Sequence, residues 1–192
     1  MKIGLYFGSF NPIHHGHLII ASYILSHSDL SQIWFVVSPL NPLKESGALL
    51  NEYHRLHLVQ LAVEGEKKMR AVDIEFKLPK PSFTINTLTY LQEKYPDYSF
   101  AVIMGSDSFQ NISRWKNYQQ ILKNYPIYVY TRPGSIELPK FSGSAIIEVR
   151  APLLEISATQ IRNNIKQAKS IRYLVPENVR EEIERNGYYK TA

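Results

Sequence analysis

The sequence lacks cysteine altogether, and none of its apolar runs is long enough to cross a bilayer. The absence of cysteine excludes disulfides and thiolate metal sites. The first residues also lack the charged and then apolar pattern of a signal peptide. We therefore expect a protein of the reducing cytoplasm that has no membrane partner.

A block of lysine and arginine is missing too, although the net charge is +5 and the pI is about 9.3. A surface for nucleic acid concentrates basic residues in a stripe with interleaved aromatics, so we expect no nucleic-acid partner. The dispersed cations suit a small polyanionic ligand instead. The oligomeric state stays open, because sequence alone does not separate an exposed apolar patch from core.

The chain has no internal repeat and no low-complexity linker, so we expect a single domain over residues 1–192. Short apolar runs alternate with helix-like segments, and this order predicts an α/β fold. The expected architecture is Rossmann-like and doubly wound, with a mostly parallel sheet covered by helices on both faces. In such folds ligands bind beyond the carboxyl ends of the strands. The runs occupy residues 3–7, 33–37, 71–76, 100–104, 127–130 and 146–149.

The segment after the first run has the residues of an anion site. Gly8 and Ser9 begin a turn, and His14 and His17 lead into an apolar helix-like stretch. A strand, a tight loop and a helix aim backbone N–H groups and the positive end of the helix dipole at a phosphate. Two histidines three residues apart lie on one helix face. Such openings are common in α/β proteins, but two histidines packed there favour phosphate binding over a purely structural role.

A second anion site is predicted near the other end of the chain. Ser157 and Gln160 have the spacing of a capping box, so a helix begins there whatever the function. Its first turns also carry the hydroxyl of Thr159 and the guanidinium of Arg162. Together with the helix N-terminus these groups form a site for anions. The alternative is a well-capped helix that carries a surface arginine.

Other polar residues follow the middle strands. Gly105 allows a close backbone approach, and Asp107 can accept two ribose hydroxyls, although a helix N-cap is the alternative role for this aspartate. Ser82 or Thr84 is expected to cap the helix-like segment that follows Thr84 and runs to Lys94. Trp115 stands at a junction of loop and helix. An aromatic residue at such a place either packs in the core or stacks on a ligand.

The run Gly8-Ser-Phe-Asn-Pro-Ile-His-His-Gly-His17 resembles the (H/T)xGH motif of the nucleotidyltransferase superfamily, and most closely the opening of nicotinate and nicotinamide mononucleotide adenylyltransferases. The run Ile156-Ser-Ala-Thr-Gln-Ile-Arg162 resembles the ISxTxIR motif of the same proteins. Further matches cover nearly the whole chain, with Phe83 where the family often has tyrosine. The resemblance implies transfer of the adenylyl group of ATP to nicotinate mononucleotide, which gives deamido-NAD and pyrophosphate in NAD biosynthesis. It also implies Mg²⁺ carried with ATP, and no metal held by the protein itself.

The resemblance assigns roles to individual residues. It places catalytic charge neutralisation on His14, His17, Lys44 and Arg162. It places ATP binding on Gly8, Ser9, Phe10, His14, His17, Gly105, Asp107, Arg132, Ile156, Ser157, Thr159 and Arg162. It places nicotinate mononucleotide binding on Asn11, Lys44, Phe83, Thr84 and Trp115.

Two other functions remain open from sequence. Pantetheine-phosphate adenylyltransferase shares the first and last motifs, although the matches at 82–84 and Trp115 speak against it. A non-catalytic nucleotide- or RNA-binding module of the same fold is the second alternative, and the intact His14, His17 and Arg162 argue against it. The choice between nicotinate and nicotinamide mononucleotide also stays open, with the positive charge mildly favouring the acid.

Overall fold

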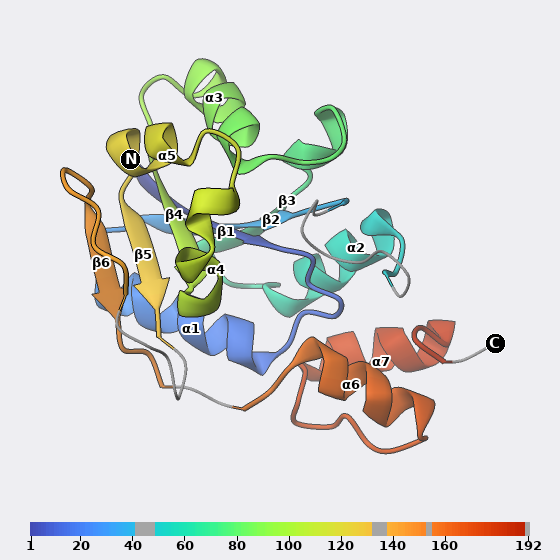
Figure 1. Cartoon of the computed structure of the whole chain (residues 1–192). Coiled ribbons are helices and arrows are strands. Elements are labelled where there is room, and N and C mark those ends of the chain that lie inside the picture. The colour runs from blue at the N-terminus through green and yellow to red at the C-terminus, as the bar shows by residue number, and fades with distance from the viewer. Residues whose placement is uncertain (41–48, 132–137, 153–154, 191–192) are drawn as a thin grey trace.

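The structure is a computed structural model that describes residues 1–40, 49–131, 138–152 and 155–190. Within these ranges one sheet holds six strands, all parallel, in the order β3-β2-β1-β4-β5-β6 (Figure 1). The strands are β1 (Lys2–Gly8), β2 (Gln32–Val37), β3 (Met69–Val72), β4 (Ser99–Gly105), β5 (Ile127–Tyr130) and β6 (Ile146–Val149). This topology confirms the predicted Rossmann-like α/β class.

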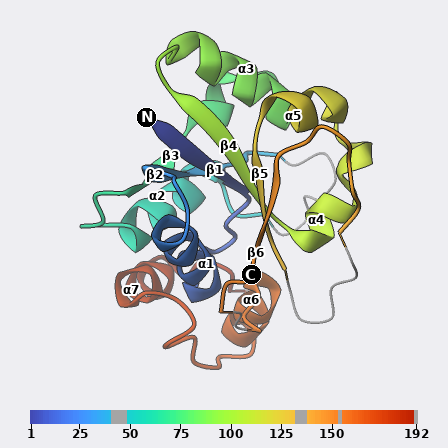
Figure 2. The same ribbon diagram turned by 90° about the vertical axis from the view of Figure 1, so that its left-hand side faces the viewer.

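Helices cover both faces of the sheet (Figures 1 and 2). One apolar core joins the sheet to α1, α2, α6 and α7, and a second core joins its other face to α3, α4 and α5. The helices are α1 (His15–Ser26), α2 (Glu52–Ala62), α3 (Thr84–Lys94), α4 (Ser106–Gln110), α5 (Tyr118–Asn124), α6 (Ala158–Lys166) and α7 (Glu177–Asn186), with short 3-10 helices η1 (Ile74–Lys77) and η2 (Ile112–Arg114).

The central strands alternate their side chains between these two cores. Ile3 and Leu5 of β1 point to the side of α3, whereas Tyr6 points to the side of α1. A strand buried on both faces needs an almost continuous apolar run, which is why residues 3–7 carry one. Each fully buried aliphatic or aromatic side chain contributes about 1.5–3 kcal/mol to the stability of the fold.

The strand order reverses between β1 and β4, which lie side by side at the centre of the sheet. The connection after β1 leads to α1 on one face, and the connection after β4 leads to α4 on the other. Two connections that leave in opposite directions open a crevice between them. The fold therefore positions a binding site at the carboxyl ends of β1 and β4.

Two local predictions were wrong. The run 71–76 is not one strand, because β3 ends at Val72 and the chain turns into η1, which carries the side chain of Glu75 into the interior. Neither Ser82 nor Thr84 caps α3: Phe83 holds the N-cap position and supplies no capping hydrogen bond. Both departures lie at the border of the crevice, where local preference gives way to the geometry of the site.

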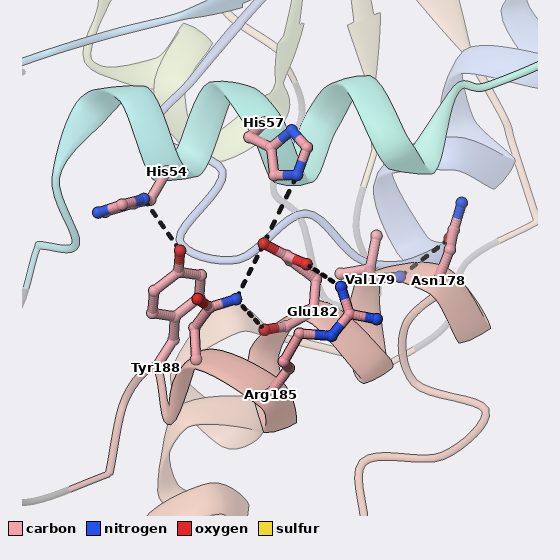
Figure 3. A network of polar contacts seen from close by, with 8 residues as sticks. His54, His57, Asn178, Val179, Glu182, Arg185 and Tyr188 are labelled. Carbon is pink, nitrogen blue, oxygen red and sulfur yellow. Dashed lines mark hydrogen bonds and ion pairs between the residues drawn. The ribbon is translucent and has the colours of Figure 1, made fainter.

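The C-terminal helix α7 is fastened to α2 by polar contacts (Figure 3). His57 of α2 lies 3.5 Å from a carboxylate oxygen of Glu182, and the hydroxyl of Tyr188 lies 2.9 Å from Nδ1 of His54. The side-chain amide of Asn178 donates to the carbonyl of Leu61 at 2.7 Å.

In the described part of the chain, no helix has the length and apolar character needed to span a membrane.

Candidate active site

A cavity of about 840 Å³ opens at the carboxyl ends of the central strands. This volume suits a ligand of cofactor size. All the predicted site residues within the described ranges line this cavity: Gly8, Ser9, Phe10, Asn11, His14, His17, Phe83, Thr84, Gly105, Asp107, Trp115, Ile156, Ser157, Thr159 and Arg162. Lys44 and Arg132 lie outside the described residues.

His14 and His17 stand at the beginning of α1, with their rings stacked at 3.7 Å between centroids. The backbone N–H of His14 donates to Nδ1 of His17 at 3.3 Å. This hydrogen bond requires an unprotonated Nδ1, so the neutral His17 ring carries its hydrogen on Nε2. His17 therefore has an N–H donor to offer an anion without needing a positive charge.

Arg162 joins the two ends of the sequence at the cavity. Its Nη1 donates to the carbonyl of Asn11 at 2.8 Å, and its Nη2 donates to the hydroxyl of Thr159 at 3.1 Å. Ser157 caps α6, because its hydroxyl accepts from the backbone N–H of Gln160 at 3.2 Å. The first loop and the N-terminus of α6 are thus held at one wall of the cavity.

A buried arginine supports this wall from beneath, and sequence reasoning did not find its role. The guanidinium of Arg55 in α2 is fully buried and donates to carbonyls on two cavity loops: Ser9 at 2.5 Å, Ser38 at 2.9 Å and Pro39 at 3.2 Å. Its Nε donates to the carbonyl of Leu50 at 2.7 Å. Burial lowers the pKa of Arg55, yet a guanidinium remains charged at neutral pH.

The sequence does contain a signal for this burial. Arg55 lies three and four residues before Leu58 and Val59, which are both fully buried, so it shares their helix face. An arginine on the apolar face of a short helix needs internal acceptors. Here these acceptors are backbone carbonyls.

Gly105 and Asp107 lie close together after β4. A Cβ atom at Gly105 would meet Oδ1 of Asp107 at 2.5 Å and the ring of Tyr130 at 3.2 Å, so any other residue there would displace the Asp107 carboxylate. Gly105 occupies the N-cap position of α4, and Asp107 lies in the first turn. Asp107 is therefore not the N-cap, and the predicted alternative role for it is wrong.

Another side of the cavity combines aromatic rings with a buried carboxyl group. Phe83 and Trp115 line it together with Glu75, which is 1% exposed. Oε1 of Glu75 accepts a hydrogen bond from the Thr87 hydroxyl at 2.9 Å. Burial raises the pKa of Glu75 and outweighs the hydroxyl groups of Ser38, Thr87 and Ser82, which lower it. The raised pKa favours the uncharged form of this carboxyl group.

The site carries several cations and no cluster of metal ligands among the described residues. Among the described residues no three His, Asp or Glu side chains gather closely enough to hold a metal ion. Arg162 and Lys116 line the cavity, and Arg55 lies beneath the loop that carries Gly8 and Ser9. This arrangement of cations suits a polyanionic ligand.

Comparison with known proteins places the chain among nucleotidyltransferases. A sequence model of the cytidylyltransferase-like family matches residues 5–164. The chain is 51% identical over 192 residues to the probable nicotinate-nucleotide adenylyltransferase of Flavobacterium psychrophilum, with 99% of this chain and 100% of the relative covered. It is 52% identical to the protein of the same description from Cytophaga hutchinsonii over 189 residues, or 98% of each chain.

A solved structure has the same fold. The nicotinic acid mononucleotide adenylyltransferase of Plasmodium falciparum complexed with NaAD superposes with a TM-score of 0.79. The two chains are 21% identical, and the superposition covers 98% of this chain and 97% of the other. The fold and the length of the two proteins therefore correspond from end to end.

Proposed function

The chain belongs to the cytidylyltransferase-like family, with the nicotinate-nucleotide adenylyltransferases, and we propose that it transfers the adenylyl group of ATP to nicotinate mononucleotide. The products are deamido-NAD and pyrophosphate. Relatives that are about half identical over the full length support this reaction. They favour it over the reaction of pantetheine-phosphate adenylyltransferase, which shares the first and last motifs.

The observation that carries the proposal is the contact between the two motifs. Asn11 follows the first motif's turn and Arg162 ends the last motif, and their hydrogen bond of 2.8 Å places both at one cavity wall. A triphosphate needs donors from several directions, because its charge is spread over many oxygens. Two helix N-termini and the guanidinium of Arg162 meet this need.

The reaction would need no general base. A phosphate oxygen of nicotinate mononucleotide, already ionised at neutral pH, attacks the α-phosphorus of ATP. The new P–O bond forms as the bond to the bridging oxygen breaks, and pyrophosphate leaves with the electron pair. The protein's part is to position the two phosphates and to stabilise the charge on the transferring group.

Each side of the cavity would take one part of the substrates. We assign the Nε2–H of His17 to the α-phosphate, His14 to the triphosphate, and Arg162 with Ser157 and Thr159 to the leaving pyrophosphate. Mg²⁺ bound to the triphosphate would neutralise part of its charge.

The nucleoside parts would lie deeper in the crevice and on its aromatic side. We assign Asp107, beside Gly105, to a ribose through its carboxylate oxygens. Trp115 would stack on the pyridine ring, beside Phe83 and Thr84. These assignments are supported by the position of all five residues on one cavity.

The direct test measures pyrophosphate release with ATP and Mg²⁺. Nicotinate mononucleotide, nicotinamide mononucleotide and phosphopantetheine are offered separately. We expect rapid release with the first substrate, slower release with the second and none with the third. Turnover with phosphopantetheine alone would overturn the assigned substrate, and no turnover with any of them would overturn the proposed activity.

A further inference from the structure

Two cations that line the cavity, Arg114 and Lys116, have no role so far. Lys116 follows Trp115, lines the cavity, and places its Nζ 4.8 Å from the centroid of the Phe83 ring. Within the described part of the chain it forms no salt bridge, and it is exposed to solvent. A lysine that contacts an aromatic ring and has no carboxylate partner can form an ion pair with an anionic ligand.

The neighbouring groups reinforce its field. Phe83 is the N-cap of α3, an 11-residue helix, and its side chain makes no capping hydrogen bond. Thr84, the first residue of this helix, lines the cavity, and the positive end of the helix dipole therefore lies on the same side as Phe83. Two carboxyl groups line the cavity, Glu75 and Asp107. Glu75 is the one near Phe83, and burial favours its uncharged form. Asp107 belongs to α4, after the central strand β4.

We propose that Lys116 is a specificity-determining residue, whose ammonium group favours a pyridine that carries a carboxylate over one that carries a carboxamide. This inference rests on the proposed function, because Trp115 and Phe83 would hold the pyridine ring there. A carboxylate on that ring gains charge attraction from Lys116. A carboxamide is neutral and gains almost none.

The experiment compares Lys116→Met and Lys116→Arg with the wild type. Methionine keeps a long unbranched side chain beside Phe83 and removes the charge, whereas arginine keeps the charge. Lys123→Met is the matched control, since Lys123 is an exposed lysine of α5 that does not line the cavity. Values of kcat/KM are measured for nicotinate and nicotinamide mononucleotide at saturating ATP.

For Lys116→Met we expect kcat/KM for nicotinate mononucleotide to fall roughly three- to tenfold, the size of one exposed charge contact. The fall should lie in KM, while the value for nicotinamide mononucleotide stays within about twofold. Lys116→Arg and Lys123→Met should keep the wild-type ratio. An equal fall for both substrates would leave the ratio of their kcat/KM values unchanged and would assign Lys116 a packing role only. That outcome, like the absence of any fall, would overturn the proposal.

Calorimetric titration of both mononucleotides, without ATP, separates this proposal from the catalytic one. Lys116→Met should weaken binding of the nicotinate form and leave the nicotinamide form unchanged. If the wild type binds the nicotinate form but releases no pyrophosphate, the proposed activity fails. The role of Lys116 is still tested by the ratio of the affinities for the two mononucleotides. If the wild type does not distinguish the two ligands, the role of Lys116 fails.

Discussion

The imidazole of His17, which is stacked on that of His14, has one donor to offer. The backbone N–H of His14 occupies Nδ1 of His17, which leaves the hydrogen of His17 on Nε2. His17 is therefore held in one tautomer by the beginning of its own helix. The contact that we propose for it with the transferring phosphate does not require a protonated ring, and this distinguishes it from the permanent cation Arg162.

Replacing His17 with alanine should lower kcat/KM for pyrophosphate release by about 10²-fold or more, because one preorganised donor to the transition state is lost. Steady-state kinetics at saturating mononucleotide measure the effect. His27→Ala is the control, since His27 lies at the other end of α1 and stacks on Tyr23 at 3.9 Å. A folded His17→Ala protein with wild-type turnover would refute the assignment.

The buried carboxyl group of Glu75 makes stability depend on pH. Burial raises its folded pKa above the ordinary value of 4.5, so the folded protein holds this proton at a pH where the unfolded chain has released it. The stabilising contribution is complete below pH 4.5. It decreases as the pH rises through the folded pKa.

Glu75→Gln should remove this dependence, since the amide keeps an acceptor for the Thr87 hydroxyl and does not ionise. We expect the wild type to lose unfolding free energy relative to Glu75→Gln as the pH rises from about 4.5, with urea denaturation as the measurement. Glu64→Gln, at an exposed position, is the control variant. A wild type that gains stability relative to Glu75→Gln over this range would contradict the neutral form.

At the scale of elements, α2 acts on the site without lining the deep part of it. Its Arg55 donates to carbonyls of the loop after β1 and of the loop after β2. When these carbonyls point toward the guanidinium, the peptide planes of Ser9 and Ser38 are fixed. The loop that begins with Gly8 is held in one conformation before any ligand binds.

Arg55→Lys should destabilise the protein by about 2–4 kcal/mol, because an ammonium on a flexible stem does not reach all four carbonyls and leaves buried acceptors unpaired. The midpoint of urea unfolding should fall, and the KM for ATP should rise. The control is Arg70→Lys, at an exposed arginine whose guanidinium stacks 3.6 Å from the Trp34 ring, where we expect a loss of less than about 1 kcal/mol. Equal losses at the two positions would argue against the loop-holding role.

At the scale of the whole molecule, the sheet and the residues around the cavity were predictable from sequence. The apolar runs at 3–7 and 100–104 mark strands buried on both faces, and the carboxyl ends of parallel strands meet at one edge. The same reasoning predicts that the polar residues after each strand lie at the ligand-binding edge of the sheet. The comparisons confirm the family that the motifs at both ends indicated.

What the sequence did not reveal depends on long-range packing. Arg55 shares a helix face with apolar residues, and Glu75 stands in a predicted strand, but only the assembled fold shows that carbonyls and hydroxyls surround them. The role that we propose for Lys116 depends on the 4.8 Å distance of its Nζ from the ring of Phe83, a residue 33 positions earlier. Periodicity describes which face a side chain takes, and it does not describe what that face meets.

The hydrogen bond between Arg162 and the carbonyl of Asn11 spans a sequence separation of 151 residues. On the ribosome, residue 11 is made roughly ten to thirty seconds before residue 162 at ordinary rates of synthesis. During that interval the growing chain has its histidines but lacks the helix that would hold the departing pyrophosphate. If α6 has this proposed role, we expect that a nascent chain consumes no ATP until translation has delivered α6.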